Sequence, residues 1–321
     1  MPISAIVSIE LFKILEMSDP RSPTIDQLRI FLAVVEEGSF AAAGRRLGRA
    51  VSAISYGIGN LENQLGLTLF EREGTKRPVL TTEGEAILAD VRVVASGVAA
   101  LHARAKGLIE GLEAEVSLVV DVMLPAERLS GILRAFACEF PTVPLRLHIE
   151  AMGAVVALVL DGRAGLGIAG PVASELDGLE RIEAGTVMLV PVAAPDHPLA
   201  QAGNLRPGAA RDHIQLVLTD RSPLTQGRDF AVQSPHTWRL ADLGAKHALL
   251  REGIGWGNMP KPMVEPDLVA GTLVQLAMPE DTGGVYRFSA IHRSDAAPGP
   301  ATSWLLDRFV ELGSDDRRAD V

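Results

Sequence analysis

The sequence predicts an α/β protein in two parts, a small all-helical module at the N-terminus and a larger α/β domain, joined by one long helix. Apolar residues recur with helical spacing over the first third of the chain. A proline-free stretch follows from residue 82 to about residue 108. After Gly111, short apolar runs alternate with amphipathic segments, which is typical of a parallel sheet covered by helices.

The composition is that of a globular protein with a full core. Of 321 residues, 47% are hydrophobic and 22% are charged, so disordered and fibrous classes are excluded. The single cysteine, Cys138, excludes an intrachain disulfide framework. No stretch reaches about 18 uncharged apolar residues, so we expect no membrane span and no membrane partner.

Residues 1–23 are expected to be an N-terminal extension. They carry an apolar stripe, but no basic segment precedes it and no small-residue cleavage site follows, so a secretory signal is not indicated. We therefore expect a cytoplasmic protein. Met17 is a candidate alternative start, and a docking helix is the other interpretation of this segment.

Three short helices are predicted next. The first begins near Ile25, with Asp26 as its N-cap and Thr24 as the alternative, and Ser39 caps the second. The third carries its apolar residues on one face from Val51 onward. Each helix is expected to end at a glycine, namely Gly38, Gly48 and Gly66.

A β-hairpin and the long helix complete the N-terminal part. Two extended pieces, Thr68–Phe70 and Val79–Thr81, flank a basic Gly-Thr-Lys-Arg-Pro tip. Thr82 and Glu85 match a capping box, which predicts a helix start there. A helix to about Leu108 would span about 40 Å. Its apolar residues predict a seam that pairs two copies: Ile87, Val91, Val94, Val98 and Leu101.

The rest of the chain predicts two α/β lobes with a cleft between them. Strands are expected at residues 116–122, 145–149, 166–169, 186–192 and 214–219, and helices at 126–140, around 155–160, 242–251 and 261–270. The pattern G-x-G-x-x-G at residues 165–170 forms a strand and is stopped by Pro171, so it does not indicate a nucleotide site. We expect no metal, no cofactor and no catalytic residue.

Charge is distributed unevenly along the chain. The net charge is −1 for residues 1–23, 0 for residues 24–110 and −9 for the remainder. Within the neutral block, basic residues form two clusters, which favours contact with nucleic acid by this part of the chain. The clusters are Arg45, Arg46 and Arg49, and Arg72, Lys76 and Arg77.

Residues 25–84 contain a run of characteristic residues, namely Gln27-Leu28, Phe31, the Gly38–Ala43 block, Leu47, Leu61-Glu62, Leu65-Gly66, the Leu69–Arg72 block, Leu80-Thr81 and Gly84. With these residues the segment resembles the DNA-binding domain of LysR-type transcriptional regulators. Later matches are Phe140-Pro141, Leu160–Gly162 and Ala194–Leu199. The resemblance covers about residues 24–310.

This resemblance implies a winged helix-turn-helix domain at residues 24–82, a linker and dimerisation helix at 83–112, and a two-lobed, periplasmic-binding-protein-like effector domain at 113–310. A C-terminal tail would follow at 311–321. The implied protein binds double-stranded DNA and a small-molecule effector as a homodimer or homotetramer, with RNA polymerase as a further candidate partner. The alternative is a solute-binding, receptor-like protein without enzymatic activity.

The third helix departs from the family pattern at its start, where Ala50, Val51 and Ser52 replace a polar cap followed by Gln-Pro. Its face opposite the apolar stripe presents Ser52, Ser55 and Tyr56. The N-terminal residues of a recognition helix meet base edges in the major groove. The predicted DNA-contacting residues are therefore Arg45, Arg46, Arg49, Ser52, Ser55, Tyr56, Arg72, Lys76 and Arg77.

The cleft between the lobes is the predicted effector site, because ligands bind outside the carboxyl ends of strands. Helix N-termini there favour an anion, and Thr237-Trp238 is expected to begin a helix. The apolar side chains there favour an aromatic or largely apolar effector. The residues expected to line the site are Met123, Leu124, Met152, Thr219, Ser222, Thr237 and Trp238.

Overall fold

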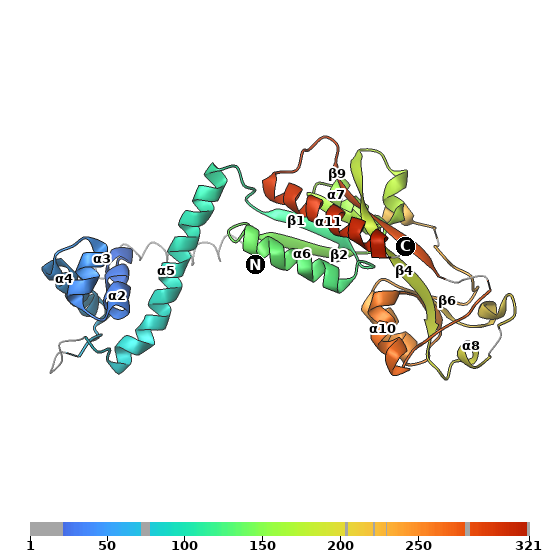
Figure 1. Ribbon diagram of the computed structural model, residues 1–321, viewed down its shortest axis with the longest axis horizontal. Helices are drawn as coiled ribbons and strands as arrows, with labels where there is room; N and C mark the ends of the chain where they lie inside the picture. Colours follow the sequence, from blue (N-terminus) through green and yellow to red (C-terminus); the bar gives the residue numbers. More distant parts are fainter. Residues whose placement is uncertain are drawn as a thin grey trace, which may run out of the picture. The chain divides into compact units, whose positions relative to one another are not determined.

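The computed structural model describes residues 22–71, 78–202, 205–220, 222–228, 230–279 and 283–319. Residues 174, 175 and 314–319 are described by their backbone alone. Contacts divide the chain into two compact units, Met1–Ala105 and Lys106–Val321 (Figure 1). The expected N-terminal extension lies almost entirely outside the described residues, as do Arg72, Lys76 and Arg77.

The first unit contains the three predicted helices, α2 (Ile25–Glu37), α3 (Phe40–Leu47) and α4 (Val51–Leu65). Each is followed by the expected glycine in the left-handed region, with φ between 64° and 68°. Ser39 caps α3 by accepting a hydrogen bond from the Ala42 amide at 3.1 Å. The expected cap of α2 was wrong, because Thr24 and Gln27 form a reciprocal capping box and Asp26 lies in the first turn.

An apolar core joins the three helices to the base of the hairpin. Phe31 and Phe70 are buried, with ring centroids 5.5 Å apart. Gly57 in α4 lies so close to α2 that a Cβ there would be 2.7 Å from Cδ1 of Ile30. This glycine therefore permits the helices to pack tightly, which accounts for its presence inside a helix.

The long helix α5 (Thr82–Ile109) is confirmed, but its predicted capping box was wrong by one residue. Thr81, and not Thr82, accepts the hydrogen bond from the Gly84 amide at 3.0 Å. Val91 is buried and Ile87 packs beside it on the helical core, so these two do not contribute to a free seam. Further along, Val93, Leu101 and Ile109 are exposed.

The length and composition of α5 would also suffice to cross a membrane, since one 18-residue window has a mean hydropathy of 1.5 and is 6% buried. Charged residues, among them Asp90 and Arg92, interrupt this apolar surface.

The second unit is built on one mixed sheet in the order β2-β1-β3-β9-β4-β7-β5-β6, with β8 also paired to β4. The strands are β1 (Val116–Asp121), β2 (Leu145–Glu150), β3 (Leu166–Ala169), β4 (Leu179–Ala193), β5 (Gln215–Leu218), β6 (Thr237–Leu240), β7 (Trp256–Pro260), β8 (Val274–Gln275) and β9 (Gly284–Arg293). The expected parallel pairs occur on both sides, β1 with β2 and β3, and β5 with β6 and β7.

The two halves share a pair of long antiparallel strands that the alternation did not predict. β4 begins at Leu179 rather than near Thr186, and it pairs with β9 from Leu179–Arg293 to Leu189–Gly284. A register shift between Glu183 and Thr186 marks where β4 passes from one half to the other. Thr237 and Trp238 lie on strand β6 and do not begin a helix, so that expectation was wrong.

Helices cover both halves of the sheet (Figure 1). In the first half α7 packs on β1, β3 and β9, and α11 packs on β4 and α6; in the second, α9 and α10 pack on β4 and β7. Their bounds are α6 (Ala126–Glu139), α7 (Gly153–Leu160), α8 (Pro198–Gln201), α9 (Leu243–Arg251), α10 (Lys261–Ala270) and α11 (Pro300–Ala319), with short 3-10 turns at Pro171–Glu175, Ala209–Asp212 and Pro223–Thr225. Helix α11 continues past residue 310.

Candidate functional site

The outer face of α4 is polar and exposed. Ser52, Ser55 and Tyr56 lie on it, and Tyr56 is 72% exposed. The opposite face, with Ile54 and Leu61, is buried against the other helices. Ala50 precedes the helix and gives no side-chain cap. The first amides of α4 are therefore available to an external acceptor, as helix N-termini are for phosphate oxygens.

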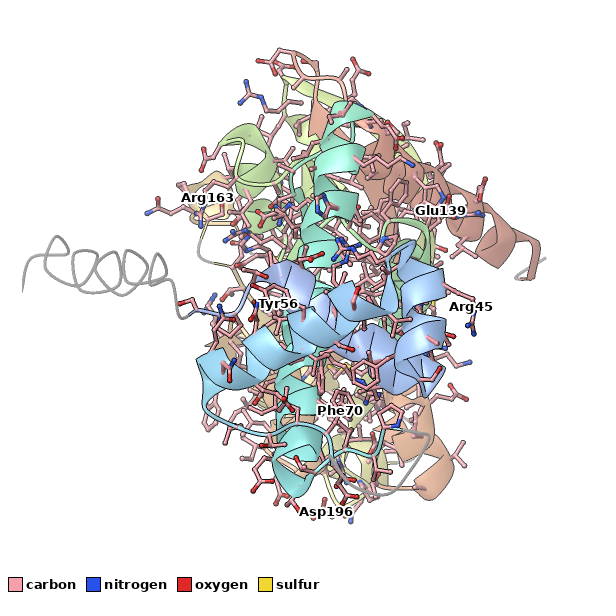
Figure 2. The ribbon with its side chains drawn as sticks, turned by 90° about the vertical axis from the view of Figure 1, so that its left-hand side faces the viewer. Arg45, Tyr56, Phe70, Glu139, Arg163 and Asp196 are labelled. Carbon is pink, nitrogen blue, oxygen red and sulfur yellow. The ribbon has the colours of Figure 1, made fainter. Side chains whose placement is uncertain are left out.

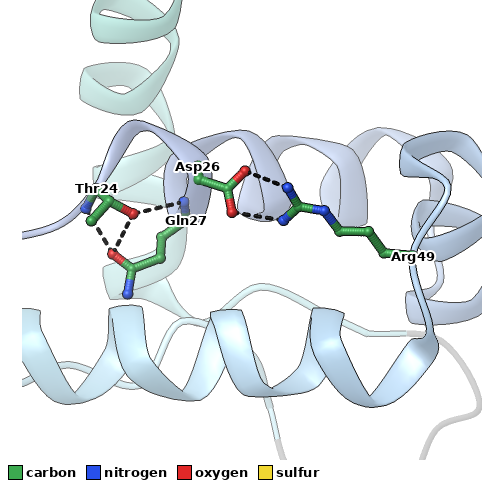
Figure 3. A network of polar contacts seen from close by, with 4 residues as sticks. All are labelled: Thr24, Asp26, Gln27 and Arg49. Atoms are coloured by element: carbon green, nitrogen blue, oxygen red, sulfur yellow. Dashed lines mark hydrogen bonds and ion pairs between the residues drawn. The ribbon is translucent and has the colours of Figure 1, made fainter.

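The three arginines at the end of α3 are not equivalent. Arg46 pairs with Glu36 at 2.5 Å and with Glu37 at 3.2 Å. Figure 3 shows Arg49 bonded through both terminal nitrogens to Asp26, at 2.6 and 2.8 Å. The bond to Arg49 lowers the pKa of the Asp26 carboxyl.

Arg45 differs from its neighbours because no ion-pair partner is found for it among the described residues. Figure 2 shows its side chain projecting away from the helices, whereas Phe70 lies among them. The sequence predicted the cluster but not this difference, because the acidic partners of Arg46 and Arg49 come from helix α2.

The base of the hairpin is held by hydrogen bonds between its two sides. Phe70 and Leu80 form an antiparallel bridge, the Glu71 amide donates to the Val79 carbonyl at 2.8 Å, and the Thr81 hydroxyl donates to the Thr68 carbonyl at 2.6 Å. The basic tip that carries Arg72, Lys76 and Arg77 lies outside the described residues.

Two neighbouring cavities, which share part of their lining, lie at the carboxyl end of β5 in the second unit. The outer one, of about 610 Å³, is lined by three predicted residues, Met152, Thr219 and Ser222. Polar side chains that were not predicted also line it, among them Asp220, Thr225, Arg228 and Arg239. These come from the loop after β5 and from β6, where the sequence shows no recognisable motif.

The inner cavity is smaller, about 130 Å³, and shares Met152, Val217, Leu218 and Phe230 with the outer one. The predicted Met123 lies on its wall. Lys246 and Tyr286 also line it, and neither was predicted. Lys246 lies in α9 directly before His247, and nothing in the local sequence indicates that its side chain is buried.

The remaining predicted effector residues lie elsewhere. Leu124 lines a third cavity of about 360 Å³, beside residues of α6 and α10. Thr237 and Trp238 line none of these three cavities, and Trp238 is 48% exposed on β6, at the sheet edge. Successive side chains of a strand point to opposite faces, which explains why Arg239 reaches the outer cavity and Trp238 does not.

Two carboxylates of the chain itself occupy the N-terminus of α7. Asp121 accepts a hydrogen bond from the Met152 amide at 3.2 Å, and Asp220 accepts one from the Ala154 amide at 2.9 Å. Met152 adopts a φ of 45°, an unfavourable value for this residue type. The amides on which an effector anion was expected to bind are therefore used within the protein.

Burial shifts the pKa of several groups around the cavities. It raises the pKa of the Asp121 carboxyl to about 6, against hydrogen bonds from the Met123 amide and the Tyr286 hydroxyl, both at 2.9 Å. It raises the pKa of the Tyr286 hydroxyl as well, and the neighbouring Asp121 charge adds to this. Burial alone lowers the pKa of the Lys246 ammonium to about 8.

Comparison with known proteins agrees with both units. Residues 25–85 match the family described as "Bacterial regulatory helix-turn-helix protein, lysR family", and residues 110–314 match "LysR substrate binding domain". A solved OxyR mutant from Corynebacterium glutamicum, with H2O2 bound, is similar in fold. Its TM-score is 0.50 at 22% identity, over 93% of this chain and 98% of that one.

Two curated relatives match over most of their length. The probable HTH-type transcriptional regulator YhaJ of Escherichia coli K12 is 30% identical over 303 residues, 92% of this chain and 99% of that protein. The HTH-type transcriptional regulator AceR of Acinetobacter baumannii is 29% identical over 246 residues, 74% of this chain and 79% of that protein. The chain belongs to the LysR family of DNA-binding transcriptional regulators, with a C-terminal effector-binding domain.

Proposed function

We propose that this regulator reads its DNA site with the outer face of α4 and holds the backbone with the basic residues around it. Ser52, Ser55 and Tyr56 contact base edges, because Ser hydroxyls serve donor and acceptor groups and Tyr56 reaches a phosphate or a thymine methyl. The exposure of these three side chains beside an uncapped helix N-terminus is the observation that carries the proposal.

Backbone contacts come from the arginine cluster and from the hairpin tip. Arg45 contributes its full charge, whereas Arg46 and Arg49 contribute less because carboxylates balance them. Arg72, Lys76 and Arg77 meet phosphates or the minor groove. A dimer with about 6–10 such contacts loses roughly 10³–10⁵ in affinity between 50 and 200 mM salt.

The effector binds in the two neighbouring cavities of the second unit. Met123, Met152, Thr219 and Ser222 contact it there. The proposed site thus keeps four of the seven residues that the sequence indicated. Leu124, Thr237 and Trp238 are left as secondary candidates, since none of them lines either of the two cavities. Binding changes the affinity for DNA or the contact with RNA polymerase, in the cytoplasm.

The regulator acts as a homodimer or a homotetramer. Exposed apolar residues of α5, such as Val94 and Leu101, supply a surface for a second copy. Light scattering at micromolar concentration tests this, and a stable monomer would contradict it.

The DNA surface is tested by selecting bound fragments from sheared genomic DNA and measuring their affinity by fluorescence anisotropy. Tyr56→Ala and Ser55→Ala are expected to weaken binding to the selected fragments more than to random DNA. Arg45→Ala is expected to weaken both alike. The matched control is Arg134→Ala, which removes an exposed arginine of α6. If Arg45→Ala and the control bound DNA equally well, the backbone role would be wrong.

A further inference from the structure

The inner cavity contains a buried ammonium group without a carboxylate partner. Lys246 is 3% exposed and donates one hydrogen bond, to the Asn258 carbonyl at 2.7 Å. Among the residues that the structure describes, no carboxylate pairs with it. Nearby acidic groups are engaged elsewhere, since Asp267 bonds His247 and Thr272, and Asp242 caps α9.

A charge in this position is energetically unfavourable until an anion joins it. Removing an ammonium from water is energetically costly unless an opposite charge compensates. The lowered pKa of Lys246, about 8, reflects this burial, but the group still carries its proton at neutral pH. At neutral pH the cavity wall therefore carries an ammonium charge with which no carboxylate of the described residues pairs.

The other groups that face the cavity do not supply a counterion. Tyr286, on β9, gives its hydroxyl proton to Asp121 on β1, at 2.9 Å. Gln215 accepts hydrogen bonds from the amides of Gln233 and Ser234, at 2.8 and 3.1 Å. Asp121 accepts hydrogen bonds from three residues of the cavity wall, Met123, Met152 and Tyr286, and does not pair with Lys246. Asp121 and Asp220 also occupy amides at the N-terminus of α7 and disfavour an anion there. Charge thus directs an anionic ligand to the Lys246 end.

The walls of the cavity fix the size and character of such a ligand. Met123, Met152, Leu189 and Phe230 line it and are apolar. Its volume, about 130 Å³, is close to that of an engineered cavity of roughly 150 Å³ that binds benzene. One ring or a similarly short chain fits, and larger substituents extend into the outer cavity.

We propose that the inner cavity binds a small organic carboxylate of one-ring size. Its anionic oxygens pair with the Lys246 ammonium, and its hydrocarbon part packs on Met123, Met152 and Phe230. The inference rests on the proposed effector site and names the chemical class that this site takes.

Calorimetric titration of the full chain with benzoate tests the proposal. Benzamide, which has the same shape without the charge, and benzylamine, which carries the opposite charge, are the comparison probes. Benzoate is expected to bind at least tenfold more tightly than either. Equal binding of benzoate and benzamide, or no benzoate binding, would overturn the assignment.

The lysine is tested with Lys246→Met, and Lys261→Met on the exposed surface of α10 is the matched control. Benzoate binding is expected to weaken at least tenfold in the first variant and to stay unchanged in the second. Lys246→Gln provides a second variant if the methionine variant does not give a cooperative thermal transition. Unchanged benzoate affinity in a folded Lys246 variant would refute the ion pair.

The same preparations are tested for binding to the selected genomic fragments. Wild type and Lys246→Met are both expected to bind DNA, since Lys246 lies in the other unit. If wild type bound no fragment, the proposed DNA surface would fail whatever benzoate did. If it bound DNA but not benzoate, only the ligand assignment would fail.

Discussion

The two units of this regulator handle charge in opposite ways. In the first, arginines stay at the surface and pair with carboxylates across neighbouring helices, as Arg49 does with Asp26. In the second, Asp121 and Lys246 are buried beside a cavity, and burial shifts the pKa of both. A surface that binds a polyanion uses solvent-exposed charges, whereas a cavity for a small ligand uses buried charged groups.

This difference sets the size of the effects that mutations produce. An exposed ion pair contributes about 0–1 kcal/mol and is screened by salt. A buried charge that lacks its partner alters stability by several kcal/mol. Variants of both units can test this contrast, beginning with the energetic independence of the two units.

The largest effect on stability is expected from removing a buried side chain from the core of each unit in turn. Phe31→Ala in the first unit and Phe288→Ala in the second each remove a fully buried ring. Each is expected to lower the stability of its own unit by about 3–5 kcal/mol. Calorimetry of the full chain should show one of two transitions moving in each variant. Parallel movement of both transitions in both variants would mean that the units unfold together.

Lys246→Met is expected to stabilise the second unit by about 3 kcal/mol at pH 7. The pKa of Lys246 falls from 10.5 to about 8 on folding. Below pH 8 the buried side chain is charged, and the folded state carries the full cost of burying that charge. Between pH 8 and 10.5 the unfolded chain binds more protons, and the wild type becomes more stable as the pH rises. Urea unfolding of both proteins at several pH values should show the difference closing over this range. If the difference in stability between the two proteins did not change with pH, the burial of the Lys246 charge would not be its cause.

A cap comparison on α5 has a smaller expected effect. Thr81→Ala removes the hydroxyl that accepts from the Gly84 amide and should destabilise the first unit by about 1 kcal/mol. Thr82→Ala, the neighbouring exposed threonine, should change stability by less than about 0.5 kcal/mol. Thermal unfolding of the two variants distinguishes them, and equal effects would contradict the observed cap.

The smallest effect on stability is expected from Asp26→Asn, which weakens an exposed ion pair by less than about 1 kcal/mol. DNA affinity should rise, because the Arg49 charge is freed for a phosphate. For every additional phosphate that the protein neutralises, the slope of the logarithm of the binding constant against the logarithm of the salt concentration becomes steeper by about 0.9. Anisotropy titrations between 50 and 200 mM salt measure this. An unchanged slope would mean that Arg49 does not face the DNA backbone.

The sequence predicted the first unit closely because its signals are local. Glycine after each helix and Ser39 before α3 act within a few residues, so their positions can be recognised directly. The two capping errors were small, and both arose where nearby residues compete as caps, at Thr24 and Asp26 and at Thr81 and Thr82. The ion pairs of Arg46 and Arg49 could not be predicted, because they depend on how α2 and α3 pack.

The second unit was predicted in outline only, because its pairing is long-range. Alternation correctly indicated parallel pairs on both sides, but nothing local reveals that Leu179 pairs with Arg293. For the same reason Lys246 and Tyr286, which lie in α9 and β9, could not be assigned to one cavity. Trp238 was expected in the site for its chemistry, whereas the pleat of an edge strand directs Arg239 there instead.

The pairing of β9 with both β3 and β4 also determines when the second unit can fold. β3 pairs with β9 from Gly167–Ile291 to Ala169–Ser289, so more than a hundred residues separate these partners. On the ribosome, β3 and β4 therefore emerge long before the strand that lies between them. Until residue 293 has left the exit tunnel, their edges expose unpaired amides and carbonyls, as aggregation-prone edge strands do. Contacts of such long range fold slowly, so the ligand-binding domain can complete its sheet only after β9 has been synthesised.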